Sequence, residues 1–342
     1  MSSLSSQGFF MPAEWHPHDC CWMGWPCRIK TWGERMYEAK LAYAEIAQAI
    51  NQSEPVKMTA RPEDAEEARK MCGTQIEIVP LPMDDSWTRD SGPTFIIDRK
   101  GKLAGIDWEF NQWGADYPDC EDDADFARAL LNHISVEHFK APFVLEGGSI
   151  HVDGDGTLMT TEQCLLHPNR NPELDQDEID QLLHEHLNVH NIIWLGEGLM
   201  DDETDGHVDN LACFIKPGAV MALISSDPED ENYDVLQDNL LRLKHAKDAR
   251  ERSLEIITVE QPEARWKEDE RLAQSYINFY LPNKGIVMPA FNDPVHDNQA
   301  REIFEKVFPD REIIQLDAQE IVMGGGGIHC ITQQQPKALV IS

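Results

Sequence analysis

Short apolar runs alternate with longer stretches of helical periodicity along the whole chain, and many of the short runs occur in pairs. The paired runs have the length of strands and flank turns rich in Gly, Pro, Asn and Asp, which is the pattern of β-hairpins. The predicted hairpins join residues 93–98 with 102–108, 149–153 with 157–161, 211–215 with 219–224, and 276–280 with 285–289.

An amphipathic stretch follows each predicted hairpin and leads into a single apolar strand. The helices are expected at residues 123–132, 172–187, 233–252 and 294–308. Strands that follow helices are expected at residues 192–195, 254–259 and 312–316. Mixed in this order, the elements predict an α/β fold.

One unit recurs along the chain, because the hairpins begin near residues 93, 149, 211 and 276, about sixty residues apart. The two ends of the chain would supply a fifth unit. A strand at 22–26, a helix at 34–51 and a strand at 75–79 would combine with a last strand near residue 328. Five like units are typical of a closed ring, and no linker interrupts them. We therefore expect residues 1–342 to form a single domain of five ββαβ-type repeats.

Acidic residues far outnumber basic ones, with 62 Asp and Glu against 29 Lys and Arg and a formal net charge of −33. Such a surface repels nucleic acids and anionic membranes and attracts small cations, so we expect neither of the first two as partners. No run approaches the ~18 apolar residues that span a bilayer, and residues 1–10 lack the features of a secretory signal. The 8 cysteines follow no repeating pattern, which favours a reduced, cytoplasmic protein.

One cluster near the N-terminus contains residue types that bind zinc. It consists of His16, His18, Cys20, Cys21 and Cys27. Their spacing fits no paired-ligand template, so we expect no metal there.

Residues suited to acid, base or nucleophilic chemistry occur at matching points of the repeat, just before or at the first strand of a unit. They are Asp90, Glu146, His207, Asp209 and Cys330. Cys330 closes a segment that begins with four consecutive glycines, which leave space for a ligand beside the backbone. Equivalent positions in a ring point toward one axis, so the five side chains should meet in one pocket. Each alone could be a turn residue, a loop cap, a local hydrogen-bond partner or a small buried thiol, but the set favours function.

This set combines one thiol, one imidazole and three carboxylates, without a basic partner. A pocket of this kind repels anions and suits a planar cation, and two aspartates can bind a guanidinium by paired hydrogen bonds. The carboxylates should raise the pKa of the thiol in the empty site, whereas a bound guanidinium or a protonated His207 should favour the thiolate. The residues therefore predict a thiol that attacks the central carbon of a guanidinium group.

At these motifs the chain resembles the family of agmatine deiminases and bacterial peptidylarginine deiminases, within the guanidine-modifying enzymes. The resemblance extends over nearly the whole chain, and its most specific parts are the segments around His207 and Cys330. The matching segments are residues 22–26, 87–94, 111–114, 146–150, 203–214 and 324–335. The resemblance implies a five-bladed, pseudo-symmetric α/β propeller of the pentein type, in agreement with the repeat.

The resemblance also implies the roles of the catalytic residues. Cys330 would be the nucleophile, His207 the general acid and base, and Glu146 the partner that orients and charges His207. The reaction would be hydrolysis of a guanidine to a urea through a covalent thiouronium on the cysteine. It requires no metal or organic cofactor.

Four further residues would bind the substrate. Asp90 and Asp209 would hold the guanidinium nitrogens, Trp87 would line the pocket, and Glu203 would lie near a distal amine. The chain departs from the family pattern at two positions outside the proposed catalytic set, where Gly and Asp stand in place of expected Asn residues. These positions are Gly327 and Asp205, and both could alter loop shape or substrate choice.

Agmatine is the expected substrate, because it has a second positive charge and no carboxylate. Its product would be N-carbamoylputrescine, which places the reaction in putrescine formation. Free arginine would need a cation for its carboxylate, and the matching segments offer only Arg89, to which the sequence assigns no role. A peptidylarginine deiminase, or another guanidine hydrolase of the same family, is the alternative.

Two hypotheses of other classes remain open at this point. Cys330 and His207 could serve a cysteine hydrolase of amides, although an oxyanion would be badly placed among three carboxylates. The chain could also be a metal-binding protein without activity, which a chelator would distinguish from an enzyme. The sequence leaves the formation of a homo-oligomer undecided.

Overall fold

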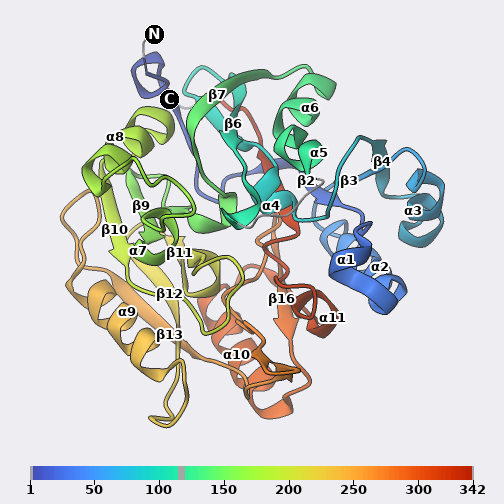
Figure 1. The fold of residues 1–342 in the computed structure, drawn as a ribbon. Coiled ribbons are helices and arrows are strands. Elements are labelled where there is room, and N and C mark those ends of the chain that lie inside the picture. Colours follow the sequence, from blue (N-terminus) through green and yellow to red (C-terminus); the bar gives the residue numbers. More distant parts are fainter. Residues whose placement is uncertain (1–2, 115–119, 341–342) are drawn as a thin grey trace.

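The described residues form six sheets, of which one is a short pairing of Trp266–Lys267 with Glu270–Arg271. The other five surround a common centre, and the longer helices lie on the outside of the ring (Figure 1). The structure, a computed structural model, describes residues 3–114 and 120–340. The strands are β1 (Phe9–Phe10), β2 (His18–Gly24), β3 (Val56–Ala60), β4 (Glu77–Pro80), β5 (Thr94–Asp98), β6 (Leu103–Glu109), β7 (Glu137–Val144), β8 (His151–Val152), β9 (Thr157–Thr161), β10 (Asn191–Leu195), β11 (Ala212–Lys216), β12 (Ala219–Ile224), β13 (Glu255–Glu260), β14 (Trp266–Lys267), β15 (Glu270–Arg271), β16 (Gly285–Ala290), β17 (Glu312–Asp317) and β18 (Thr332–Pro336).

The helices connect the strands within each unit. The α-helices are α1 (Ile29–Trp32), α2 (Met36–Ile50), α3 (Ala65–Cys72), α4 (Thr88–Ser91), α5 (Glu121–Ala124), α6 (Phe126–His133), α7 (Glu162–Leu165), α8 (Gln176–Leu187), α9 (Tyr233–His245), α10 (Pro294–Val307) and α11 (Gln319–Val322). The 3-10 turns are η1 (Ser5–Gln7), η2 (Gly33–Arg35), η3 (Gln112–Gly114), η4 (Gly147–Ser149) and η5 (Val208–Asn210).

An antiparallel pair, a helix and a parallel third strand make up the repeating unit. In one unit β11 and β12 pair antiparallel, α9 follows, and β13 returns parallel to β12. The sheets β5-β6-β7 and β8-β9-β10 repeat this order, and β1 extends the first of them. The ring closes where β18 pairs antiparallel with β2, so the two ends of the chain share one sheet, β18-β2-β3-β4.

Amphipathic helices bury one face against the sheets of their own units. In α2 the side chains of Tyr43, Ile46 and Ile50 follow helical spacing and are fully buried, in the same cluster as Met58 of β3. A capping box of Asp175 and Glu178 begins α8, so this helix starts a few residues after its predicted first residue, 172.

The predicted pattern differs from the structure in several places. Residues 276–280 do not form a full strand, because Tyr280 makes only an isolated bridge to Val287 of β16. Helix α9 ends at His245, not at 252, and β18 begins at Thr332, a few residues later than predicted. Strand β3 and helix α3, which lie between α2 and β4, were not predicted from the sequence. Within the described residues, none of the helices has both the length and the apolar character needed to cross a membrane.

Candidate functional site

Each residue predicted from the repeat lies in or directly beside a short turn that precedes a strand. Asp90 lies in α4 before β5, and Glu146 immediately precedes η4 and then β8. His207 and Asp209 flank the start of η5 before β11, and Cys330 lies in the turn before β18. All five are at most 3% exposed. The repeat therefore brings the five residues into one dry interior, as predicted.

The thiol of Cys330 contacts two side chains from other units. Asn278 donates from Nδ2 to Sγ over 3.2 Å, and Asp209 Oδ2 lies 3.7 Å from the sulfur. Burial raises the pKa of Cys330 well above its ordinary value, and the charges of Asp209 and Asp90 raise it further. The expected direction is confirmed, although burial contributes more than the carboxylates. The thiol is therefore protonated in the empty site.

Gly148 marks the point where three of the predicted side chains converge. A Cβ atom on this glycine would lie 2.5 Å from His207 Nδ1, 2.9 Å from Asp90 Oδ1 and 3.1 Å from Asp209 Oδ2. Its own N–H donates to Asp90 Oδ1 over 2.9 Å. The absence of a side chain at Gly148 therefore leaves the two aspartates and the imidazole facing one another.

The two aspartates of this group differ in charge. Burial and the neighbouring charge of Asp209 raise the pKa of Asp90 to about 8, against hydrogen bonds from Trp113 and Gly148 that lower it. Burial also opposes the ionisation of Asp209, but the hydrogen bond and charge of His329 hold the pKa of Asp209 below its ordinary value. The pKa shifts of the two groups therefore point in opposite directions, which favours the negative charge on Asp209 over Asp90.

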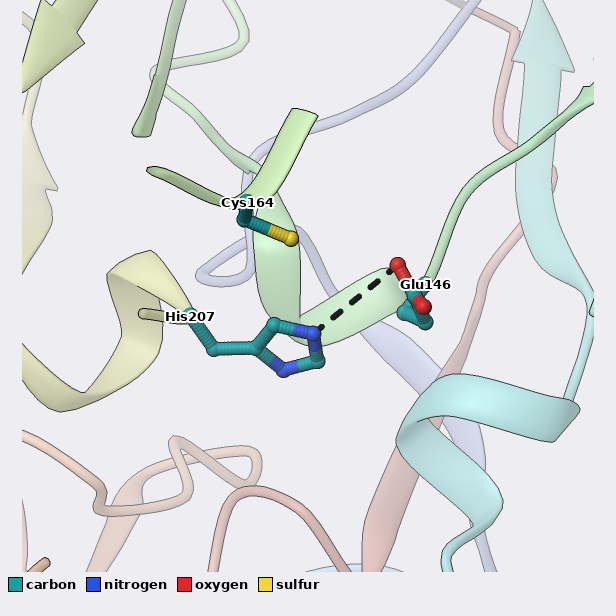
Figure 2. A group of neighbouring side chains, drawn as sticks. All are labelled: Glu146, Cys164 and His207. Atoms are coloured by element: carbon teal, nitrogen blue, oxygen red, sulfur yellow. Dashed lines mark ion pairs between the residues drawn. The ribbon is translucent and has the colours of Figure 1, made fainter. Parts of the chain in front are cut away.

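His207 lies between Asp90 and Glu146. Its Nδ1 is 3.7 Å from Asp90 Oδ1, and its Nε2 is 3.9 Å from Glu146 Oε2 (Figure 2). Among the residues that the structure describes, neither ring nitrogen has a hydrogen-bond partner, and Glu146 Oε2 also has none. Burial lowers the pKa of His207 to about 3, and the charge of Arg170 lowers it further although Asp209 opposes this shift. The imidazole is therefore neutral, and its protonation requires a compensating negative charge nearby.

Cys164 of α7 points toward the same space as His207 and Glu146 (Figure 2). The ligand atoms of the three residues lie within 4.8 Å of one another, so this group has the spacing of a metal site. Arg170 binds the other oxygen of Glu146 over 2.6 Å and reduces the attraction of the group for a cation. The N-terminal His and Cys cluster forms no such group among the described residues, and its His18 instead pairs with Glu54 over 3.0 Å.

Arg170 connects Glu146 to one of the two departures from the family pattern. Its guanidinium donates from Nε to Glu146 and from Nη1 to Asp205 Oδ2 over 2.8 Å, and its side chain is fully buried. The other departure, Gly327, lies against Asn278, because a Cβ atom there would lie 2.3 Å from Asn278 Oδ1. Each departure therefore contacts a residue that in turn contacts the proposed catalytic set: Asp205 contacts Arg170, and Gly327 contacts Asn278.

We expect replacement of Arg170 by glutamine to lower the free energy of unfolding by about 3–5 kcal/mol, because the buried Glu146 would lose its counter-charge. Arg242 is the matched control, since it also binds two carboxylates but lies partly exposed at the surface. Arg242→Gln should cost about 0–1 kcal/mol. Urea unfolding of both variants measures the difference, and equal losses would contradict a special role for the buried pair.

Trp87 and Glu203 each lie beside one of the glycines that precede Cys330. A Cβ atom on Gly326 would lie 2.5 Å from the Trp87 ring and 3.1 Å from Cys330 Cβ. The preceding glycine, Gly325, faces the carboxylate of Glu203, an exposed residue. Both residues therefore lie close to the glycine segment, and their roles in binding stay predictions.

Arg89 serves the fold. It is 2% exposed and donates from Nη1 to the side chains of Gln333 and Gln334, each over 2.8 Å, and from Nε to the His329 carbonyl. These bonds attach α4 to β18 beside the closure of the ring. With its head group directed at β18, Arg89 is badly placed to bind a substrate carboxylate.

Several residues that contact the site were not predicted from the sequence. They are Glu14, Trp113, Arg170, Asn278 and His329. Trp113 donates to Asp90 over 2.9 Å and lies in the segment 111–114, which matches the family. Asn278 lies in the first strand of the predicted fourth hairpin, where the repeat indicates a site residue. Glu14 and Arg170 lie outside the segments that carried the resemblance, so no local signal identified them.

Comparison with known proteins gives consistent relatives over the full chain. A family model described as Porphyromonas-type peptidyl-arginine deiminase matches residues 10–336. A protein of Legionella pneumophila, provisionally named agmatine deiminase, is 53% identical over 333 residues, which cover 97% of this chain and 96% of that protein. The agmatine deiminase of Pseudomonas aeruginosa (strain LESB58) is 44% identical and covers 98% of this chain, with 97% of its own length matched.

A solved structure is also closely similar. It is the agmatine deiminase of Enterococcus faecalis, with a TM-score of 0.95, 35% sequence identity and coverage of 99% of both chains. The five-bladed α/β fold class predicted from the sequence is thereby confirmed.

Proposed function

Because the chain belongs to the Porphyromonas-type peptidyl-arginine deiminase family, we propose that it hydrolyses agmatine to N-carbamoylputrescine and ammonia. The membership confirms the resemblance found in the sequence. The observation that carries the proposal is the convergence of Asp90 and Asp209 at Gly148, with the Cys330 thiol 3.7 Å from Asp209 Oδ2. Two acidic groups beside a thiol match a planar cation with an electrophilic carbon.

Guanidinium binding activates the site through charge. Asp209 supplies the anion of the site. Its Oδ1 is buried and has no hydrogen-bond partner within residues 3–114 and 120–340, so it can accept from the substrate. The arriving cation favours ionisation of Asp90, which then completes a pair of acceptors. The same positive charge lowers the pKa of Cys330, so that thiolate forms only when the substrate is present.

The reaction has two steps, formation and hydrolysis of a covalent intermediate, and His207 transfers the proton in both. The Cys330 thiol loses its proton to His207, and the sulfur forms a bond to the guanidinium carbon. His207 returns the proton to a terminal nitrogen, the C–N bond breaks, and ammonia leaves a thiouronium on Cys330. Water then attacks this carbon while His207 takes a water proton, the C–S bond breaks, and the hydroxyl proton of the adduct passes to the departing sulfur. A urea is formed and the thiol is regenerated, and His207 releases its proton to solvent, where ammonia takes it up as ammonium. Glu146 stabilises His207 in its transient charged form.

Several charges near the site favour agmatine over arginine. Arg170 is committed to protein partners, Arg89 directs Nε and Nη1 at the His329 carbonyl and at β18, and a carboxylate beside Gly325 would meet Glu203. The cleft beside Glu203 also contains Asp201 and Glu270, alongside Lys267 and Arg271. Three carboxylates against two cations give this cleft a net negative charge, which suits the second ammonium of agmatine.

Ammonia release from agmatine, free arginine and a blocked arginine peptide tests the proposal. We expect kcat/KM for agmatine to exceed that for arginine by about 100-fold or more, since arginine would place a carboxylate among acidic groups without a cation to bind it. Each assay should be run with and without a chelator, and we expect no effect of the chelator. Equal rates on all three compounds, or preference for the peptide, would contradict the agmatine assignment.

The remaining sequence predictions belong to the same proposal. Residues 1–342 would act as a single catalytic domain, with Cys330, His207 and Glu146 in catalysis and Asp90, Asp209, Trp87 and Glu203 in binding. A cytoplasmic location and the absence of a cofactor stay predictions, and self-association stays undecided.

A further inference from the structure

His329 lies between two buried carboxylates from distant parts of the chain. Its Nδ1 lies 2.8 Å from Asp209 Oδ2, and its Nε2 lies 3.0 Å from Glu14 Oε2. Glu14 belongs to the segment between β1 and β2, Asp209 to η5, and His329 to the turn before β18. All three are less than 9% exposed. Three units of the ring therefore meet at one imidazole.

Hydrogen-bond chemistry fixes the charge of this imidazole. An ionised carboxylate accepts and does not donate, so two ionised carboxylates require an N–H on both ring nitrogens. Burial and Arg89 oppose a positive charge on His329, but Glu14 and Asp209 outweigh them and raise its pKa. Burial likewise opposes ionisation of Glu14, yet His329 and His151 hold its pKa well below the ordinary value. The trio is anion, cation and anion.

The neighbouring His151 cannot take over this role. Its Nδ1 accepts from the Phe214 backbone N–H over 3.3 Å, so its proton is on Nε2, which lies 3.6 Å from Glu14 Oε2. A cavity of about 10 Å³ lies beside these residues and is at most large enough for a single water. With so little solvent, the charges of the trio act on one another almost unscreened.

We propose that Glu14 and His329 are positioning residues that keep Asp209 ionised and oriented, and thereby decide which aspartate of the pair receives the guanidinium as a fixed anion. The inference rests on the proposed function, since it assigns a role in the same reaction. Two buried carboxylates side by side cannot both ionise easily. Asp209 is hydrogen-bonded to His329, whereas the donors to Asp90 in the described part of the chain, Trp113 and Gly148, are neutral. The proton of the empty site is therefore located on Asp90.

A pH profile would also report on the other charged and titratable groups around Glu14, His329 and Asp209, the three residues of this relay. His329 faces Glu14, Asp209, His151, Arg89 and His207, and Asp209 faces His329, Cys330, His207, Asp90, Asp202 and Arg89.

Glu14→Gln tests the relay with little change of shape. The amide oxygen can still accept from the Leu281 N–H, as Glu14 Oε1 does over 3.1 Å, while its NH2 faces His329. His329 would then become neutral and donate only to Asp209. Loss of the positive charge should raise the coupled pKa values of the two aspartates. We expect the acid limb of kcat/KM for agmatine to move up by about one pH unit, a tenfold loss on that limb.

Glu54→Gln is the matched control. Glu54 also forms a buried pair with a histidine, since its Oε2 lies 3.0 Å from His18 Nδ1. This variant should lose stability but keep the wild-type pH profile. The relay is wrong if Glu14→Gln lowers kcat/KM equally at every pH, or if both variants shift the profile alike.

Nitrogen-15 NMR of His329 gives a reading that does not depend on the substrate. We expect both ring nitrogens protonated in the wild type at neutral pH and a single N–H in Glu14→Gln. A neutral His329 in the wild type would overturn the relay even if Glu14→Gln does not fold. If the wild type shows the charged imidazole but no turnover of agmatine, the proposed function fails and the relay stands.

Discussion

Replacement of Cys330 by serine is expected to lower ammonia release from agmatine by about 10⁴-fold or more, because a neutral hydroxyl cannot replace the thiolate as nucleophile. The thiol is held by Asn278 and lies 3.7 Å from Asp209, so serine should fit without disturbing either neighbour. Agmatine should still bind, since the carboxylates remain. Steady-state kinetics and calorimetric binding measure the two effects separately.

Cys164 provides the matched control for this experiment. It is also buried and lies near His207 and Glu146, but it belongs to α7 (Figure 2). Asn278 and Asp209 instead contact the thiol of Cys330. Cys164→Ser should keep kcat within about threefold of the wild type, because the nucleophile is unchanged. A mass increase trapped by acid quenching should appear on the peptide that contains Cys330. Inactivity of Cys164→Ser together with activity of Cys330→Ser would exchange the two assignments.

Replacement of Asp90 by asparagine should lower kcat/KM for agmatine by about 10³-fold, because the substrate loses one of its two charge-assisted contacts and the ability of that contact to ionise. The same change should improve stability at high pH. The pKa of Asp90 is about 8 in the folded protein, above its ordinary value, so the folded state holds a proton that the unfolded chain releases. The stabilisation that Asp90 contributes is present at low pH and is lost as the pH rises toward 8.

Thermal unfolding at two pH values tests this prediction. The Tm of Asp90→Asn relative to the wild type should rise by at least ~2 °C between pH 6 and pH 9. Asp209→Asn is the control in the same pocket, because the pKa of Asp209 is lowered and its charge contributes stability at neutral and high pH. That variant should lose activity without the gain at pH 9. Unchanged kcat/KM in Asp90→Asn would remove Asp90 from the binding pair.

Local patterns were sufficient to predict most of the strands. The hairpin of β11 and β12 and that of β5 and β6 follow from alternating apolar residues around Gly- and Pro-containing turns. The segment 276–280 has the same signal but does not form a full strand, because Asn278 and its neighbours turn toward the site instead of pairing along β16. A functional loop here overrides strand propensity.

The sequence also predicted which side chains would meet, through the repeat. Asp90, Glu146, His207, Asp209 and Cys330 hold equivalent places in their units, so the ring symmetry brings them together. The repeat could not predict which of the two aspartates is ionised, because a pKa depends on burial and on neighbours that the repeat does not specify.

Strand alternation, turn residues and the repeat are local signals, so they were sufficient to predict the five-unit fold and the five side chains that converge near Gly148. Which carboxylate carries the charge depends on the tertiary structure. Glu14 and His329 are 315 residues apart in the sequence, and His329 and Asp209 are 120 apart. Their effect on Asp209 arises from proximity in a dry interior, where a single hydrogen-bonded cation changes which of two neighbouring acids is ionised.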